Sequence, residues 1–395
     1  MITVANSDFG ANVLCSSWLQ SKRTSHIFRG IQVATIAASL ALFATHLLVH
    51  EQPFGSCAFS AGLALPAPNP KSTFAAPAST SHRPTAKSCI LLYMIGGPPQ
   101  QDTFDLKPNT SAEIRGEFRP ISTVVPGLQI CEHLPKLAKV ANLYSLIRSM
   151  YHDGGLLHAA GVHYNLIGWK NSPRSGQPLL SRRDSPSIGS VLTQLEGRRN
   201  PHRSRDLPTA IQLPSWITQD GPGQEWAGQH AGFLGQKYDP LFMDYKGDPP
   251  GRLPPDFVPA NENVGPRLGQ RMNLLHAMDK HSVVGPAKAT QAWSDSQREA
   301  LNVLRSSPDW QAFCIDQETP KTRERYGEHH FGRSCLVARR LVEKGVRLVT
   351  VTWPISKEFP HFDTHADNYP TMRKNLQPPT KAFPLCWKIC ETAAC

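Results

Sequence analysis

The sequence lacks a Cys-x-x-Cys pair, a long basic run, and aromatic residues interleaved with its basic ones. Its nine cysteines therefore show neither a zinc-knuckle pattern nor a disulfide framework. The formal net charge is +11, but the basic residues are scattered. Because nucleic-acid binding pairs basic grooves with stacking aromatics, this charge does not indicate a nucleic-acid partner. A solvated basic loop is the simpler interpretation, and attraction to anions or to an envelope surface is the second.

The N-terminus carries an apolar run at residues 31–49, which contains no acid and no base except His46. Basic residues precede it, as in a signal peptide or an N-terminal membrane anchor. We therefore expect residues 1–50 to direct export to the periplasm or cell envelope, with 31–49 anchoring the chain in the membrane if it is not cleaved. A buried helix of a soluble domain is the third alternative. Residues 51–86, rich in Pro, Ala and Ser, predict a linker.

An apolar segment at Cys89–Ile95 predicts a strand covered on both faces, as in a parallel sheet. The Gly-Gly-Pro-Pro run at 96–99 ends it. Asp102 and Asp105 follow in a polar loop. Ligands of open α/β sheets bind beyond the carboxyl ends of the strands, so these acids are candidates for metal binding or catalysis. The simpler alternative is that they solvate a surface loop or cap the next helix.

A second strand with a polar loop is predicted late in the chain. Residues 332–344 predict a helix that Gly345 ends, and Val346–Trp353 predicts a strand. The patterns between these two regions also predict regular elements. We expect strands at 117–125, 144–148 and 207–213. We expect helices at 134–140, 157–167, 186–195, 267–278 and 293–304, with Ser185 as the N-cap and Pro186 as the first residue of the helix ending at 195.

The loop after the late strand contains His361, Asp363 and His365 in alternation. In extended backbone, residues two apart point the same way, so these three side chains would face one point. Imidazole and carboxylate groups together suit zinc or a similar divalent metal. The alternative is a polar loop in which Asp363 caps a helix that starts at Thr364.

Two further histidines, His158 and His163, fall in the helix predicted over 157–167. His158 would lie in its first turn, where backbone N–H groups and the helix dipole favour anions. Taken singly, each histidine is more simply interpreted as an ordinary core or surface residue.

Several segments together resemble a known family. They include SCILLYMIGGPPQQDTFDLKP, AGFLGQKYDPL, RERYGEHHFGRSCLVARRLVEKGVRLVTVTW and FDTHADN. They resemble domain-of-unknown-function family 1501, whose exported bacterial members are grouped with the alkaline phosphatase and sulfatase superfamily. The resemblance covers residues 87–383. It implies the α/β sandwich fold of that superfamily, with a largely parallel central sheet and one or two divalent metals, of the zinc or calcium class, at the strand ends.

The resemblance also implies roles for particular residues. Asp102 resembles the first metal-ligand acid, with Asp105 as the neighbouring candidate, and Asp363 and His365 resemble the later ligands. Where the superfamily places a Ser, Thr or Cys nucleophile, this chain has Leu-Leu-His ending at His158. This departure weakens the case for a covalent mechanism.

Water activated by a divalent metal is the alternative to a side-chain nucleophile. His158 or His163 would then act as acid, base or further ligand. The resemblance ends after Phe383, and residues 384–395 contain three cysteines and no family character. We expect a truncated or frame-shifted domain that lacks further ligands and at least one strand.

The sequence thus predicts an exported, metal-dependent hydrolase of sulfate or phosphate esters, with sulfated or phosphorylated polysaccharide as the substrate class and activity impaired by truncation. A non-catalytic envelope protein that uses the same fold for binding is the alternative, favoured by the missing nucleophile.

Overall fold

The computed structural model describes residues 2–5, 86–150, 158–168, 181–199, 207–218, 225–243 and 308–392, together with a few helical residues between 270 and 278. The predicted anchor at 31–49, nearly all of the linker and the helix predicted at 293–304 lie outside the described residues. Within them, no helix is both long enough and apolar enough to cross a membrane.

A five-stranded sheet forms the centre of the protein, in the order β1-β2-β7-β5-β6. Its strands are β1 (Ile2–Ala5), β2 (Cys89–Tyr93), β7 (Leu348–Thr352), β5 (Ala210–Leu213) and β6 (Leu241–Phe242). The strands β2, β7, β5 and β6 are parallel, and β1 pairs antiparallel with β2 at the edge. The prediction of an α/β protein with a largely parallel sheet is confirmed.

The central strands are apolar along their whole length because both faces of the sheet are covered. Every residue of β5 and β7 is buried, and so are four of the five residues of β2. Each buried polar side chain must then find a partner inside the protein. Thr352 in β7 does so by donating from Oγ1 to the carbonyl of Ser215, at 2.8 Å.

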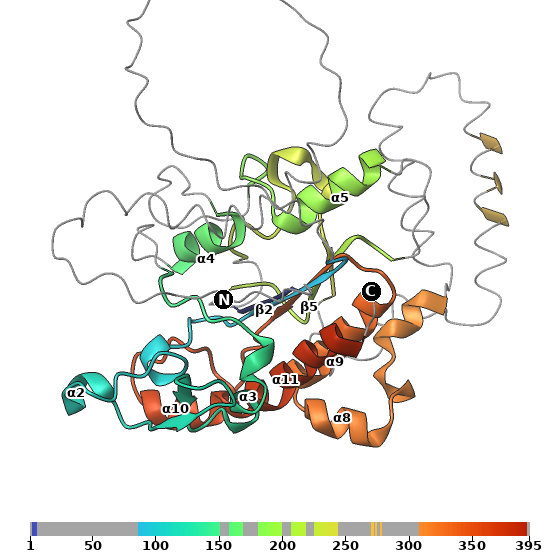
Figure 1. The fold of residues 1–395 in the computed structure, drawn as a ribbon. Helices are drawn as coiled ribbons and strands as arrows, with labels where there is room; N and C mark the ends of the chain where they lie inside the picture. The colour runs from blue at the N-terminus through green and yellow to red at the C-terminus, as the bar shows by residue number, and fades with distance from the viewer. Residues whose placement is uncertain are drawn as a thin grey trace, which may run out of the picture.

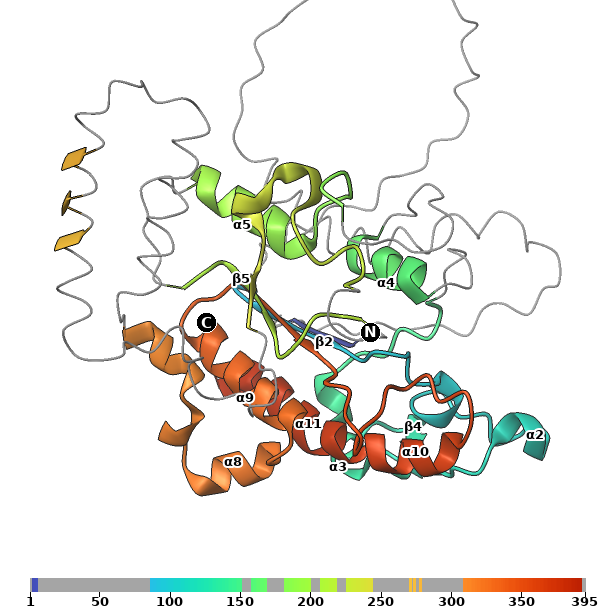
Figure 2. The same ribbon diagram turned by 180° about the vertical axis from the view of Figure 1, so that it is seen from behind.

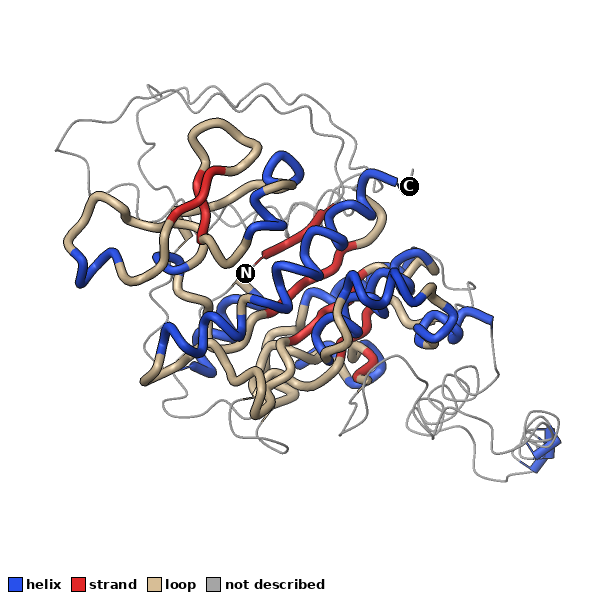
Figure 3. Tube along the Cα trace, turned by 90° about the horizontal axis from the view of Figure 1, so that it is seen from below, coloured by secondary structure: helices blue, strands red, loops and turns tan. Residues whose placement is uncertain are grey.

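Helices lie on both faces of the sheet (Figures 1 and 2). One face carries α4 (His158–Ile167) and α5 (Ile188–Arg199). The other carries α9 (His330–Glu343), which packs on β7 and β2, and α11 (Gln377–Thr392), which packs on α9. Viewed from that side, helices cover the strands (Figure 3). The remaining helices are α2 (Ala112–Arg115), α3 (Pro135–Ala138), α8 (Pro320–Tyr326) and α10 (Asn368–Asn375).

The helix α9 shows why the late part of the chain was predictable. Its buried face includes Phe331, Cys335 and Leu341, spaced for one side of a helix. At its N-terminus, Nδ1 of His329 accepts a hydrogen bond from the backbone N–H of Gly332, at 2.9 Å. Its end lies next to Gly345, whose φ of 89° favours glycine.

Two local predictions are wrong. Residues 144–148 form no strand: a short 3₁₀ turn at Ala141–Leu143 leads into irregular chain. The helix α5 begins at Ile188 and is capped by Ser187, whose Oγ accepts from the backbone N–H of Ser190, so Ser185 is not the N-cap. The predicted strand at 117–125 is confirmed as β3 (Pro120–Ser122), but its antiparallel partner β4 (Gln129–Cys131) was not predicted.

Candidate metal site at the ends of two strands

The strands β2 and β7 are neighbours, so the loops that follow them meet at one edge of the sheet. The backbone N–H of Phe362 donates to the carbonyl of Ile95, at 2.9 Å. Gly96 lies so close to the later loop that a Cβ atom on it would be 2.2 Å from the backbone nitrogen of Asp363. The two loops are therefore in direct contact.

Three side chains converge at this edge: His158, Asp363 and His365. One ligand atom from each lies within 4.8 Å of the other two. Oδ2 of Asp363 is 2.9 Å from Nε2 of His365 and 3.3 Å from Nε2 of His158. The carboxylate thus holds both imidazoles, one from the start of α4 and one from the loop after β7. The two histidine side chains are exposed, so the group opens to solvent.

The backbone of this loop differs from the predicted extended form. His365 has φ of 50° and Asp367 has φ of 51°, both left-handed, so the residues do not alternate along an extended chain. His361, which was predicted to be the third side chain, lies outside the cluster. The third side chain is that of His158. The alternative that Asp363 caps a helix at Thr364 is also wrong, because α10 begins at Asn368.

Asp102 is not one of the three members of this cluster. Its side chain is buried, and Oδ2 accepts a hydrogen bond from Nδ2 of Asn368, at 3.0 Å. Oδ1 has no hydrogen-bond partner among the described residues. Burial raises the pKa of Asp102, and the hydrogen bond from Asn368 opposes that rise. The unpartnered oxygen leaves Asp102 a candidate metal ligand in the loop after β2.

Asp105 has a different environment. Its two carboxylate oxygens face two basic side chains, with Lys107 on Oδ2 and Nη1 of Arg148 at 3.4 Å from Oδ1. Because both oxygens are already paired, Asp105 is less suited than Asp102 to bind a metal.

His163 is on α4 with His158 but faces elsewhere. Five helical residues separate their directions by about 140°, so one helix cannot aim both at the same point. His163 is buried against Gly228, and Nε2 finds no hydrogen-bond partner among the described residues. Burial lowers its pKa, and the nearby Asp184 partly opposes this. It is a neutral core histidine in this arrangement.

Two residues of the site were not predicted. The ring of Trp226 lies parallel to that of His158, with centroids 6.3 Å apart. Asn368, in the first turn of α10, donates to Asp102 and accepts from Oγ1 of Thr364, at 3.3 Å. Asn368 belongs to the family-like segment FDTHADN, which is the only sequence signal for it. Trp226 has no such signal.

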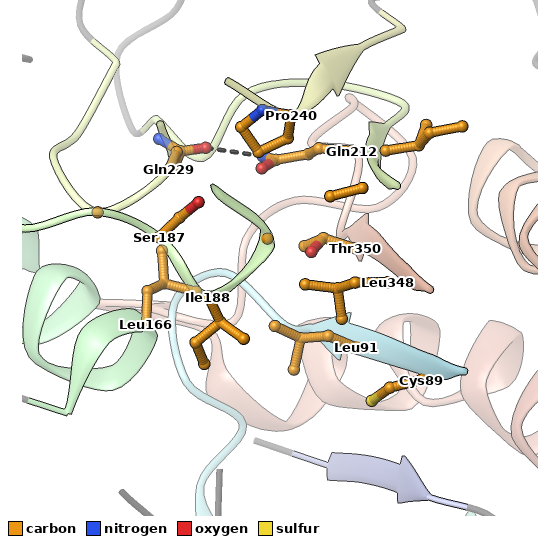
Figure 4. A pocket seen from close by; sticks show the side chains of 14 residues that line it. Cys89, Leu91, Leu166, Ser187, Ile188, Gln212, Gln229, Pro240, Leu348 and Thr350 are labelled. Carbon is orange, nitrogen blue, oxygen red and sulfur yellow. Dashed lines mark hydrogen bonds between the residues drawn. The ribbon is translucent and has the colours of Figure 1, made fainter. Parts of the chain in front are cut away.

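A separate small cavity, of about 40 Å³, lies between α5 and the sheet (Figure 4). Its lining is mostly apolar, with Gln212 of β5 donating across it to Oε1 of Gln229, at 2.7 Å. None of the three clustered side chains lines it. A space of this size holds about one water molecule, so it is a packing space rather than a substrate site.

A mostly parallel sheet covered by helices, with histidine and aspartate side chains gathered at its carboxyl edge, defines this chain as an α/β protein with a candidate metal site. Residues 86–382 match the family described as protein of unknown function (DUF1501). The match spans well over half of the chain, and the protein therefore belongs to that family. Comparison with curated proteins and with solved structures gives no match.

Proposed function

We propose that this protein is an exported, metal-dependent hydrolase of sulfate or phosphate esters, with the sandwich fold of the alkaline phosphatase and sulfatase superfamily. The observation that carries the proposal is the convergence of His158, Asp363 and His365 within 4.8 Å. Three protein ligands with one open side are typical of catalytic rather than structural zinc sites. Sulfated or phosphorylated polysaccharide is the substrate class that we propose.

The donor set fits a divalent metal of the zinc class. Two of its three donors are imidazole nitrogens, which suit zinc and other transition metals, whereas calcium takes oxygen ligands almost alone. His158, Asp363 and His365 would hold the ion, and Asp102, whose Oδ1 has no hydrogen-bond partner among the described residues, is the further ligand that we propose.

A divalent metal bound here would supply a Lewis acid that activates water and polarises the ester oxygen. Residues of the protein would shape the site and bind the ester. Oδ2 of Asp363 lies beside Nε2 of both histidines, and a bound ion would replace these contacts, because a nitrogen that binds a metal cannot also donate a hydrogen bond. His158 is the first residue of α4, so the N–H groups of that turn favour an anionic ester beside it. The ring of Trp226 borders this position and offers a flat surface for a sugar ring.

The alternative is a non-catalytic envelope protein that binds anionic polysaccharide at the same place. The observation that favours it is the absence of a hydroxyl or thiol at residues 156–158, where the superfamily has its nucleophile. Binding needs only the cation and the aromatic surface, whereas hydrolysis also needs an activated water.

Both proposals require a bound metal ion, so the metal content of the protein tests that common requirement. The full-length protein would be dialysed against Zn²⁺, and bound metal would be measured by atomic spectroscopy. We expect about one ion per chain, lost in His365→Ala and Asp363→Ala. His361→Ala is the matched control, since it removes an imidazole from the same loop outside the cluster. Equal metal in His361→Ala and His365→Ala variants would refute the site, and Asp102→Asn shows whether Asp102 shares the ion.

Hydrolysis of aryl sulfate and aryl phosphate esters by the metal-loaded protein separates the two proposals. Turnover that is lost in His365→Ala and kept in His361→Ala supports the hydrolase. Stoichiometric metal without turnover, combined with binding to a sulfated polysaccharide, supports the alternative.

A further inference from the structure

The segment that lies beyond the family match is part of the core. The match ends at residue 382, yet α11 continues to Thr392. Phe383 and Cys386 are buried, and the Phe383 ring packs edge-on against that of Phe331 on α9, with centroids 5.9 Å apart. The chain after 382 is therefore held against a helix that belongs to the family domain.

This packing brings two thiols together. Cys335, in the middle of α9, and Cys386, on α11, have exposed fractions of 0% and 1%. Cys335 follows Phe331 by one turn of α9, and Cys386 follows Phe383 by one turn of α11, so each thiol lies one turn beyond the ring contact between the two packed helices. Both are free thiols in the structure. Tyr326, at the end of α8, is also buried, and α8, α9 and α11 pack against one another.

We propose that Cys335 and Cys386 form a disulfide bond that fastens the C-terminal helix to the family domain. The reaction is thiol–disulfide exchange with an external disulfide. Two S–H bonds are lost and one S–S bond forms in the protein, while the oxidant takes up two electrons and two protons to become two thiols. An exported protein would meet such oxidants in the cell envelope. The bond itself is independent of any catalytic function.

Burial controls when the bond forms. Enclosure in the core raises the pKa of the Cys335 thiol, and exchange requires the thiolate. The closed pair is therefore unreactive, and oxidation proceeds while α11 is still docking or when it opens. Pro384 assists opening, because it cannot donate the helical hydrogen bond to residue 380. Once made, the bond is shielded from reductants by the same burial.

Peptide mapping tests the proposal directly. The full-length protein would be reduced in denaturant, refolded in a mixture of oxidised and reduced glutathione, denatured in the presence of an alkylating agent, and digested with trypsin without reduction. Tryptic cleavage puts Cys335 in Ser334–Arg339 and Cys386 in Ala382–Lys388, while Cys390 lies in the following peptide. We expect these two peptides joined, at a mass lower than their sum by two hydrogen atoms. Recovery of both as alkylated single peptides, or of Cys386 joined to Cys390, would overturn the proposal.

Thermal unfolding provides a second readout. The wild-type protein refolded in the glutathione mixture is expected to melt roughly 5–10 °C above the same protein that was reduced in denaturant and refolded in reductant, because the bond closes a long loop in the unfolded chain. The Cys386→Ser variant should show no such difference, and Cys390→Ser should show it in full. The comparison with reductant needs no substitution, so a poorly folded Cys386→Ser variant leaves the test intact. Equal melting temperatures with and without reductant would contradict the bond.

Discussion

Asn368 donates a hydrogen bond from Nδ2 to Oδ2 of Asp102, at 3.0 Å, across 266 residues of sequence. The bond joins the loop after β2 to the first turn of α10. The Asp102 carboxylate is buried, and its other oxygen, Oδ1, has no hydrogen-bond partner among the described residues. The loops that hold the candidate site are therefore connected by an amide that is not itself in the cluster.

Removing this amide is expected to destabilise the protein. Asn368→Ala leaves the buried Asp102 carboxylate without its hydrogen bond, at a cost of about 1–3 kcal/mol in the free energy of unfolding. Asn368→Asp should cost more, because it places a second carboxylate beside the first. Urea denaturation measures both, with the exposed Asn109→Ala as the control. Equal stability of the Asn368→Ala and Asn109→Ala variants would show that the bond contributes nothing.

Adjacent glycines offer a sharper test of the loop contact. A Cβ on Gly96 would be 2.2 Å from the backbone nitrogen of Asp363, whereas nothing lies within 4 Å of one on Gly97. Both have positive φ, so Gly97→Ala should cost about 1–2 kcal/mol from backbone strain alone. Gly96→Ala must also displace the loop that carries Asp363 and His365. We expect it to be the less stable of the two and to lose bound zinc, while Gly97→Ala keeps it.

His329 is expected to make stability depend on pH. Burial, followed by the charges of Lys381, His330 and Arg333, lowers its pKa to about 4. The unfolded state, with a pKa near 6.5, therefore binds more protons between pH 4 and 6.5, so stability rises with pH across that range. Protonation would also remove the lone pair of Nδ1 that accepts from Gly332. The whole effect is about 3 kcal/mol or less, and is fully present above pH 6.5.

The check is the free energy of unfolding of the wild-type and His329→Asn proteins between pH 4 and 7. Asparagine keeps an N-cap acceptor and does not titrate. We expect a flatter profile in the variant, with a remaining slope from His163 and His230, whose pKa values are also lowered by burial. Superimposable profiles would mean that His329 does not titrate in this range.

Arg340 on α9 holds the preceding segment in place. Its guanidinium donates from Nη1 to Oε1 of Glu318, at 2.8 Å, and from Nε to the carbonyl of Ala312, at 2.9 Å. We expect Arg340→Ala to reduce the free energy of unfolding by about 1–3 kcal/mol, because the Ala312 carbonyl loses this donor and the Glu318 carboxylate keeps only its pairing with Arg339. Lys344→Ala, which removes the more exposed pair with Asp309, should cost less than about 1 kcal/mol. Thermal or urea unfolding would rank the two.

Much of the fold was predictable because its signals are local. β2 and β7 are short apolar runs ended by Gly or Pro, and α9 has an apolar face with Gly345 after its end. The missed strand β4 is three residues long, too short for a pattern to develop. The irregular chain at 144–148 carries an apolar pattern like that of a strand, but no neighbouring strand pairs with it. Strand identity at such length depends on a partner, which local sequence does not provide.

The sequence alone determined the central strands β2, β5 and β7, the helix α9, the family, and the presence of acids and histidines after two strands. Only the tertiary structure decided which of these side chains meet. His158 reaches Asp363 because α4 begins at that histidine beside the β7 loop, and His365 reaches it because its backbone is left-handed. His361 and His163 also carry imidazole groups, but neither belongs to the cluster. The direction of a side chain depends on backbone dihedrals and on packing between distant segments, and neither is encoded in residue spacing.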